Sequence, residues 1–293
     1  NPRTSRPNLV HTLVRTIQAS QLKGKNPETG PDSYAPQNRF EDLPISELLK
    51  RNIISRNYLL PTPIQDQTIL PILQGRDIIG IANTGTGKTA AFLIPLIDKV
   101  FKNKTEKVLI VTPTRELATQ IDDELRHFSK GMQIYSVLCV GGLSLFRQKH
   151  ELRLSHNFVI GTPGRLKDLV RQKVLDLTRF SIVVLDETDR MVDIGFIDDI
   201  RYFKSLLPRE RQSLFFSATV PAKVKEIIRT FVRNPLTVSV KIDDTVDNID
   251  QTIIRVTDKH KKIEQLHDLL IQEGFNKVLI FGRTKWGVEK LSI

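Results

Sequence analysis

The residues from Ala82 to Thr89 combine the side chains and the backbone freedom that a phosphate group needs from a protein. The run reads Ala-Asn-Thr-Gly-Thr-Gly-Lys-Thr. Its glycines allow a sharp turn, so several backbone N–H groups can point at one anion. Lys88 can reach the β- and γ-phosphates, and the Thr89 hydroxyl can ligate Mg²⁺. We therefore predict a nucleoside triphosphate site whose cradle consists of Thr84, Gly85, Thr86, Gly87, Lys88 and Thr89.

The neighbouring sequence places this loop between a strand and a helix. The apolar run 78–81 favours a buried strand, and residues 90–93 continue as a helix. A helix N-terminus carries about half a positive charge, which favours an anion there. The general phosphate-loop pattern starts with glycine, whereas this chain has Ala82. The strand-loop-helix context therefore supports the prediction more than the pattern alone does.

Two adjacent carboxylates follow another apolar run. Residues 181–185 read Ser-Ile-Val-Val-Leu and predict a buried strand that leads into Asp186 and Glu187. Asp186 can bind Mg²⁺, usually through water, and Glu187 is placed to orient and polarise an attacking water. A strand that simply ends in solvated acids has the same pattern, but the phosphate loop favours catalysis. The predicted catalytic residues are Lys88, Asp186 and Glu187, and the predicted metal ligands are Thr89 and Asp186.

The composition favours a polyanionic partner. The chain has 44 Lys and Arg residues against 33 Asp and Glu residues, a net charge of +11. Such a balance favours nucleic acid before a membrane surface, although a well-solvated basic surface is the alternative. Cys139 is the single cysteine, so an internal disulfide is excluded, and its apolar neighbours favour packing over reactivity. No run approaches the roughly 18 apolar residues of a membrane helix and no secretory signal is present, so we expect a cytoplasmic protein.

Apolar and amphipathic runs alternate between residues 40 and 240, which predicts an α/β fold. Short runs rich in Val, Ile, Leu and Phe indicate buried strands at Lys107–Thr112, Gln133–Val140, Asn157–Gly161, Ser181–Asp186, Ser213–Ser217 and Leu236–Val240. Amphipathic helices separate them, and Pro63 suits the first turn of a helix that runs to about Leu73. We expect a mostly parallel sheet sandwiched by helices, with ligands at the carboxyl ends of its strands.

The two ends of the chain differ from this middle part. Residues 1–39 are basic and rich in proline, and we expect a flexible arm with one short helix at 9–19. Residues 241–250 are polar and acidic and read as a linker. Residues 251–293 predict the start of a second α/β domain, with strands at 251–256 and 277–281 and a helix at 260–273, too short to be complete. The chain lacks an initial Met and stops in a helical pattern, so we expect a fragment.

Taken together, these motifs resemble those of the DEAD-box RNA helicases. Their order and approximate spacing match over about residues 40–290, and the ordered set is much more specific than any one motif. The matching segments are Pro61–Gln65, Ala82–Thr89, Pro113–Ala118, Gly141–Gly142, Thr162–Arg165, Asp186–Asp189, Ser217–Thr219 and Val278–Thr284. The resemblance implies a RecA-like P-loop NTPase domain followed by part of a second one.

The resemblance also implies roles for residues outside the phosphate loop. Gln65 would read the edge of adenine and Phe40 would stack on the base, which gives a preference for ATP; an amide can bond two adjacent groups on adenine. One RNA strand would be held through its backbone, independently of sequence, by Pro113, Arg115, Gly142, Thr162, Gly164 and Arg165. Coupling of the ATP state to RNA would depend on bonds from Ser217 and Thr219 toward Asp189.

Two departures from the family pattern affect the expected activity. Thr188 stands where the family has Ala, and we expect this small change to be tolerated, with ATP turnover changed less than tenfold by Thr188→Ala. The His-Arg-x-Gly-Arg segment, which supplies the family's arginine finger, has no counterpart in the sequence, because the only arginines after Arg233 are Arg255 and Arg283. Arginine fingers accelerate hydrolysis on the order of a thousandfold. We therefore expect this chain to bind ATP better than it hydrolyses it.

Three functions fit these observations to different degrees. The first is an ATP-dependent RNA helicase that couples ATP hydrolysis to local unwinding or remodelling of RNA. The second is an ATP-gated RNA clamp or assembly scaffold without productive unwinding. A small-molecule kinase or GTPase fits the phosphate loop alone, but the Asn-Lys-x-Asp run that reads guanine is missing from both Asn-Lys pairs, at Asn103 and Asn276. ATP, Mg²⁺ and RNA are the ligands that the first reading requires.

Overall fold

The structure is a computed structural model, and it describes residues 34–240, 252–256, 258, 261–272 and 277–291 of the chain. The chain divides into two compact units, Asn1–Ile242 and Asp243–Ile293. The predicted helix at 9–19, most of the predicted arm at 1–39 and the predicted linker at 241–250 lie outside the described residues. The proposed domain boundaries stay predictions.

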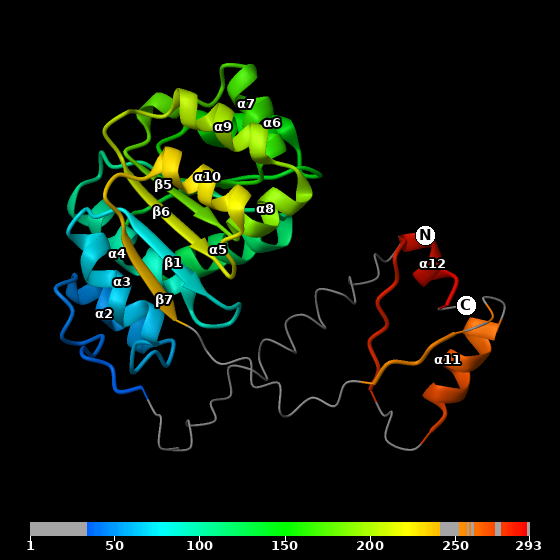
Figure 1. Cartoon of the computed structure of the whole chain (residues 1–293). Coiled ribbons are helices and arrows are strands. Elements are labelled where there is room, and N and C mark those ends of the chain that lie inside the picture. The colour runs from blue at the N-terminus through cyan, green and yellow to red at the C-terminus, as the bar shows by residue number, and fades with distance from the viewer. Residues whose placement is uncertain (1–33, 241–251, 257, 259–260, 273–276, 292–293) are drawn as a thin grey trace, which may run out of the picture. The chain divides into compact units, whose positions relative to one another are not determined.

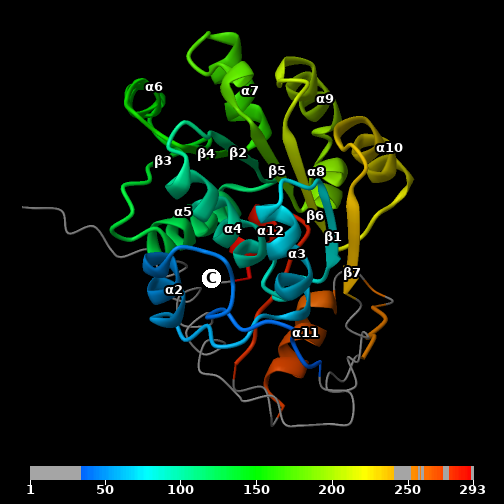
Figure 2. The same cartoon turned by 90° about the vertical axis from the view of Figure 1, so that its left-hand side faces the viewer.

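The first unit is built around a seven-stranded sheet with the order β3-β4-β2-β5-β6-β1-β7 (Figures 1 and 2). Every pairing in this sheet is parallel. The strands are β1 (Ile78–Ala82), β2 (Val108–Val111), β3 (Ser136–Cys139), β4 (Phe158–Gly161), β5 (Ile182–Asp186), β6 (Gln212–Ser217) and β7 (Leu236–Val240). The predicted α/β class with a parallel sheet is confirmed.

Strand residues point alternately to two separate hydrophobic cores, one on each face of the sheet. In β2, Val108 and Ile110 belong to one core and Leu109 and Val111 to the other. When helices cover both faces of a strand, the side chains on both faces are buried, which explains the uninterrupted apolar runs in the sequence. Cys139 is buried in the second core, where burial raises the pKa of its thiol to about 12, so it packs as an apolar side chain.

Helices cover both faces of the sheet, as the two views show (Figures 1 and 2). The first core includes side chains from α2 (Glu47–Ile54), α3 (Pro63–Leu73), α4 (Lys88–Lys102) and α5 (Arg115–Phe128). The second core includes side chains from α6 (Leu145–Arg153), α7 (Pro163–Arg171), η1 (Leu177–Arg179), α8 (Thr188–Ile194), α9 (Ile197–Leu206) and α10 (Ala222–Phe231). The predicted helix from Pro63 to Leu73 is confirmed. No helix in the described part of the chain is long and apolar enough to span a bilayer.

The order of the strands brings the predicted site residues to one edge of the sheet. Strand β6 lies between β1 and β5, with Ile81 in register with Ser217 and Asp186 in register with Phe216. Because all three strands are parallel, the phosphate loop, the two carboxylates and the Ser217 segment leave the sheet at the same edge. That edge is where ligands bind in open parallel sheets.

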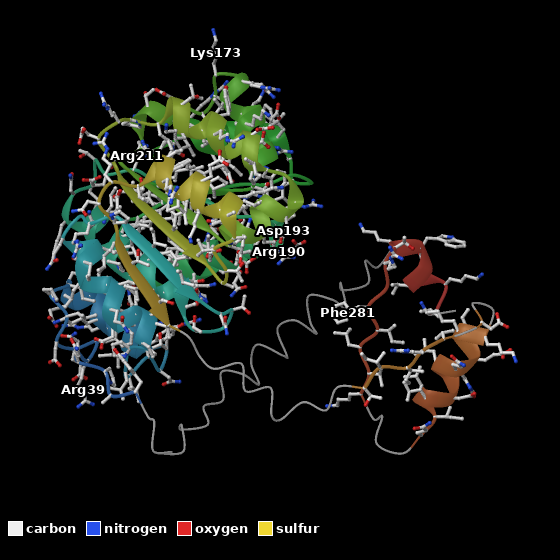
Figure 3. The ribbon with its side chains drawn as sticks, viewed as in Figure 1. Arg39, Lys173, Arg190, Asp193, Arg211 and Phe281 are labelled. Carbon is white, nitrogen blue, oxygen red and sulfur yellow. The ribbon has the colours of Figure 1, made fainter. Side chains whose placement is uncertain are left out.

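Predictions for the second unit are only partly correct. Its described residues form the helices α11 (Lys262–Leu270) and α12 (Lys285–Glu289), and α11 lies within the helix predicted at 260–273. The described residues of both predicted strands, 252–256 and 277–281, are not in strands, so these two predictions are wrong. A strand needs a neighbouring strand with which its backbone can form hydrogen bonds. The apolar side chains that a sheet would bury are instead exposed to solvent: Ile253 is 87% exposed and Phe281, labelled in Figure 3, is 88% exposed.

Candidate active site

The phosphate loop is closed by its own hydrogen bonds. The Lys88 Nζ atom donates to the Ala82 carbonyl oxygen at 2.7 Å, so the ends of the loop are tied together. The Thr86 hydroxyl donates to the Asn83 carbonyl oxygen at 2.8 Å. Gly87 has a φ of 90°, a left-handed conformation that favours glycine, and α4 begins at the next residue. A buried ammonium group at the start of a helix suits a bound phosphate.

The predicted adenine-reading segment contacts this loop directly. The Gln65 Nε2 atom donates to the Gly87 carbonyl oxygen at 3.0 Å, and its Oε1 atom accepts from the Thr62 backbone N–H at 2.9 Å. The Thr62 hydroxyl donates to the Thr86 carbonyl oxygen at 2.8 Å. Both polar ends of the Gln65 side chain are therefore bound to protein, and recognition of adenine stays a prediction that requires one of these bonds to be exchanged. Thr62 lies within the predicted segment Pro61–Gln65, but its own contact with the loop was not predicted; the available signal is its position before the first turn of α3.

Phe40 lies in the protein interior and not on the surface. Its side chain is 1% exposed and belongs to the first core. The ring packs edge-on against Tyr58 with a centroid distance of 6.1 Å, and Tyr58 packs in the same way against Phe128. Base stacking by Phe40 therefore stays a prediction that requires this ring to be uncovered.

The two predicted catalytic carboxylates occupy different environments. Asp186 is 2% exposed, and burial raises its pKa to about 7, while the charge of Lys88 opposes the shift and that of Glu187 adds to it. Glu187 is in the left-handed conformation with a φ of 49°, which is costly for a side chain other than glycine. Its carboxylate pairs with Arg190 at 3.4 Å, at the start of α8. Arg190 is not among the predicted site residues.

Asp189 joins α8 to the segment that follows β6. Its Oδ2 atom accepts from the Thr219 backbone N–H at 2.9 Å and from the Thr219 hydroxyl at 2.8 Å. The Ser217 hydroxyl oxygen accepts from the Asp189 backbone N–H at 3.2 Å. Burial alone would raise the pKa of Asp189, but these hydrogen bonds outweigh it and lower the pKa. The three predicted coupling residues are therefore in contact, whereas their coupling role stays a prediction.

The predicted RNA-binding loops also meet. They follow β2, β3 and β4, which are neighbours in the sheet. The Arg115 Nη1 atom donates to the Gly141 carbonyl oxygen at 2.8 Å, and the Arg165 Nη1 atom donates to the Leu143 carbonyl oxygen at 3.4 Å. A Cβ atom on Gly142 would lie 1.8 Å from the Arg115 Nη1 atom, so only glycine leaves room for this arrangement. The loops with Pro113, Gly142, Thr162 and Gly164 thus form one surface with two arginines.

Thr188, which replaces the family's usual Ala, fits without displacing its neighbours. Its side chain is fully buried, and its hydroxyl donates to the Leu185 carbonyl oxygen at 3.3 Å. A buried hydroxyl with a backbone acceptor carries little penalty. The effect of this residue on ATP turnover stays a prediction.

A parallel sheet with a phosphate loop after β1 and acidic residues after β5 defines a P-loop nucleotide-binding domain. Residues 62–227, more than half of the chain, match the family model described as DEAD/DEAH box helicase. The chain belongs to the DEAD/DEAH box helicase family, as the resemblance implied.

Curated relatives and solved structures agree with this assignment. The chain is 38% identical over 256 residues to the ATP-dependent RNA helicase CshA of Limosilactobacillus reuteri, which covers 87% of this chain and 51% of the relative. It is 40% identical over 255 residues to the DEAD-box ATP-dependent RNA helicase CshA of Bacillus subtilis strain 168, with 86% and 51% coverage. The chain thus spans about half the length of the curated relatives it matches. A crystal structure of a DEAD box protein from the hyperthermophile Methanococcus jannaschii is similar with a TM-score of 0.67 and 32% identity, covering 87% of this chain and 69% of that one.

Proposed function

We propose that this chain binds ATP with Mg²⁺ and RNA, and that it belongs to an ATP-dependent RNA helicase that unwinds or remodels short RNA duplexes. The observation that carries the proposal is the buried Asp186 carboxylate, which interacts electrostatically with the ammonium group of Lys88 in the phosphate loop. A buried carboxylate with a pKa raised to about 7 gains most from a cation next to it. The names of the CshA relatives support both the nucleotide and the RNA.

The chain supplies suitable groups for each part of the nucleotide. Thr84 to Thr89 and the N-terminus of α4 would hold the phosphates, and the Thr89 hydroxyl and Asp186 would hold Mg²⁺. Gln65 would read adenine. Bound MgATP supplies the phosphoanhydride bond whose cleavage drives the cycle, and the metal neutralises charge on the phosphates. Glu187, which has a left-handed backbone conformation next to Asp186, would orient the attacking water.

Coupling would depend on the contacts between α8 and the segment after β6. A change at Asp186 or Glu187 reaches Asp189 within two or three residues, and Asp189 holds Thr219 and Ser217 through hydrogen bonds. The RNA backbone would lie on the surface formed by the loops after β2, β3 and β4. Arg115 and Arg165 would provide the charge, and contacts to the sugar-phosphate backbone would make binding independent of sequence.

The decisive test is steady-state phosphate release with and without single-stranded RNA, measured for this chain and for the longest protein its gene encodes. We expect RNA to stimulate release by the longer protein more than by this chain, and Glu187→Gln to reduce the stimulated rate more than tenfold while ATP still binds. Glu226→Gln, on the exposed surface of α10, is the matched control and should leave the rate unchanged. ATP-dependent retention of RNA with no phosphate release by the unchanged proteins would contradict the helicase proposal and support a clamp.

A further inference from the structure

The outward face of α6 carries an exposed aromatic ring among basic side chains. Phe146, Lys149, His150 and Arg153 are spaced at i, i+3, i+4 and i+7, so they lie on one face of the helix. Phe146 is 82% exposed, which is unusual for a phenylalanine, and His150 and Arg153 are exposed as well. We call these four residues the α6 stripe.

Neither packing nor ion pairing accounts for this composition. The opposite face of α6 is fixed by buried Gln148 and Leu152, and the Gln148 Nε2 atom donates to the Val140 carbonyl oxygen at 3.0 Å. Arg147, between the two faces, pairs with Glu151 at 2.8 Å. Within the described residues, Lys149 and Arg153 have no carboxylate at ion-pair distance. Two cations and an aromatic ring therefore remain available to a ligand.

The stripe continues from the surface proposed for the RNA backbone. The carbonyl oxygens of Gly141 and Leu143, which accept from Arg115 and Arg165, belong to the loop that leads directly into α6. Phe146 follows Gly142 by four residues, so the two lie within about 14 Å of each other. Helices α6 and α7 lie next to each other in both views (Figures 1 and 2), and Arg165 is in the first turn of α7. The stripe itself extends about 10 Å along the helix axis.

We propose that the α6 stripe is an additional contact site for single-stranded RNA, with one nucleobase stacked on Phe146 and phosphates beside Lys149 and Arg153. This inference rests on the proposed function, and extends its RNA path beyond the backbone-binding loops. Every base has a face that stacks on an aromatic ring, so the site would add affinity without adding sequence preference. It would also make binding depend on the length of the RNA, because only a strand long enough to leave the loops reaches α6.

The test compares single-stranded oligouridylates of six and twelve nucleotides, which bind to the full chain and are followed by fluorescence anisotropy. We expect Phe146→Ala to weaken binding of the longer RNA about tenfold and to leave the shorter RNA unaffected. Phe146→Tyr keeps the ring and should bind as the unchanged chain does. Tyr135→Ala removes another exposed aromatic, 57% exposed at the opposite end of β3, and serves as the control.

A second measurement separates the two parts of the site. For the longer RNA, the association constant falls as the salt concentration rises, and the double variant Lys149→Ala/Arg153→Ala should make the slope of log K against log salt less negative by about 1.4. Phe146→Ala should leave this slope unchanged. If Arg115→Ala weakens RNA binding but none of the α6 variants does, the stripe is not an RNA site and the inference fails while the proposed function stands. If the unchanged chain binds neither RNA, the proposed function fails and the inference fails with it.

Discussion

At the scale of single residues, two glycines in the site make room for a functional side chain. A Cβ atom on Gly87 would lie 2.3 Å from the Gln65 Nε2 atom, and a Cβ atom on Gly142 would lie 1.8 Å from the Arg115 Nη1 atom. Both glycines also have a positive φ. Each glycine therefore has two reasons for its identity, the backbone conformation and the space for a neighbour. In the phosphate loop, Gly85 has a positive φ but no neighbour within 4 Å of its Cβ position, so it allows the two to be measured apart.

For the phosphate loop, Gly85→Ala and Gly87→Ala form the matched pair. Both positions have a positive φ, so each substitution should lower the free energy of unfolding by about 1 kcal/mol. A Cβ atom on Gly85 meets nothing within 4 Å, whereas the one on Gly87 displaces Gln65. Urea denaturation should show a further loss of about 1 kcal/mol for Gly87→Ala. In a Gln65→Ala background the extra loss should disappear. If the effects of Gly87→Ala and Gln65→Ala on the free energy of unfolding were strictly additive, the contact between these residues would not contribute to stability.

For the RNA surface, Gly142→Ala is compared with Gly141→Ala. The first substitution should push the Arg115 guanidinium away from the Gly141 carbonyl oxygen, while the second introduces a Cβ atom that meets nothing within 4 Å. A lost phosphate contact of an arginine weakens binding about tenfold, so Gly142→Ala should raise the Kd for single-stranded RNA by that factor and Gly141→Ala should not. Equal affinities of the two variants would contradict the placement of Arg115 on the RNA path.

At the scale of elements, the sheet was predictable and the surroundings of individual side chains were not. Parallel strands are buried on both faces, so runs such as Val108–Val111 reveal them directly. The run 277–281 looks the same in sequence, but a strand also needs partners, which local composition does not supply. The amide side chain of Gln65 indicated a hydrogen-bonding role. Only the folded loop shows that the Gly87 carbonyl oxygen accepts a hydrogen bond from this amide. The burial of Phe40 could not be predicted either, because an isolated aromatic suits a base and a core equally well.

The start of α3 is held to the upstream segment by one buried carboxylate. Asp66 accepts hydrogen bonds from the Tyr34 hydroxyl at 2.5 Å and from the backbone N–H groups of Gln37 at 2.7 Å and Asn38 at 3.2 Å. Burial alone would raise the pKa of Asp66, but the hydrogen bonds from Tyr34, Asn38 and Gln37 lower it. This carboxylate thus fixes the chain just before Phe40, one residue from Gln65.

The lowered pKa of Asp66 makes this contact sensitive to pH. A carboxylate whose pKa is lower in the folded protein stabilises it above the unfolded pKa of 3.8, and that contribution is lost as the pH falls through the folded value. At pH 7, Tyr34→Phe should lower the free energy of unfolding by about 1 kcal/mol and speed hydrogen exchange at the Gln37 and Asn38 amides. As the pH falls through the folded pKa of Asp66, the difference in exchange between the variant and the unchanged chain should shrink. A difference that persists undiminished would contradict a role for the ionised carboxylate.

At the scale of the whole molecule, the two units differ in how much they bury. Both hydrophobic cores consist of residues between Phe40 and Val238, on the two faces of one sheet. By contrast, no residue of α11 or α12 is buried. Since buried apolar surface is the main favourable contribution to folding, the first unit contributes most of the free energy of unfolding. It also contains every residue proposed to bind nucleotide or RNA or to couple the two.

A chain of residues 34–242 should therefore fold and bind nucleotide by itself. We expect its melting temperature to lie within about 3 °C of that of the full chain and its affinity for ATP to lie within about threefold, because the cores and the phosphate loop are unchanged. A chain of residues 34–232 is the control: it lacks β7, which pairs with β1 from Ile78 to Ala82 directly before the phosphate loop, and it should lose both cooperative unfolding and ATP binding. If the longer of these chains also lost ATP binding, residues 1–33 or 243–293 would have to supply part of the site, and the assignment of all nucleotide contacts to residues 34–242 would be wrong.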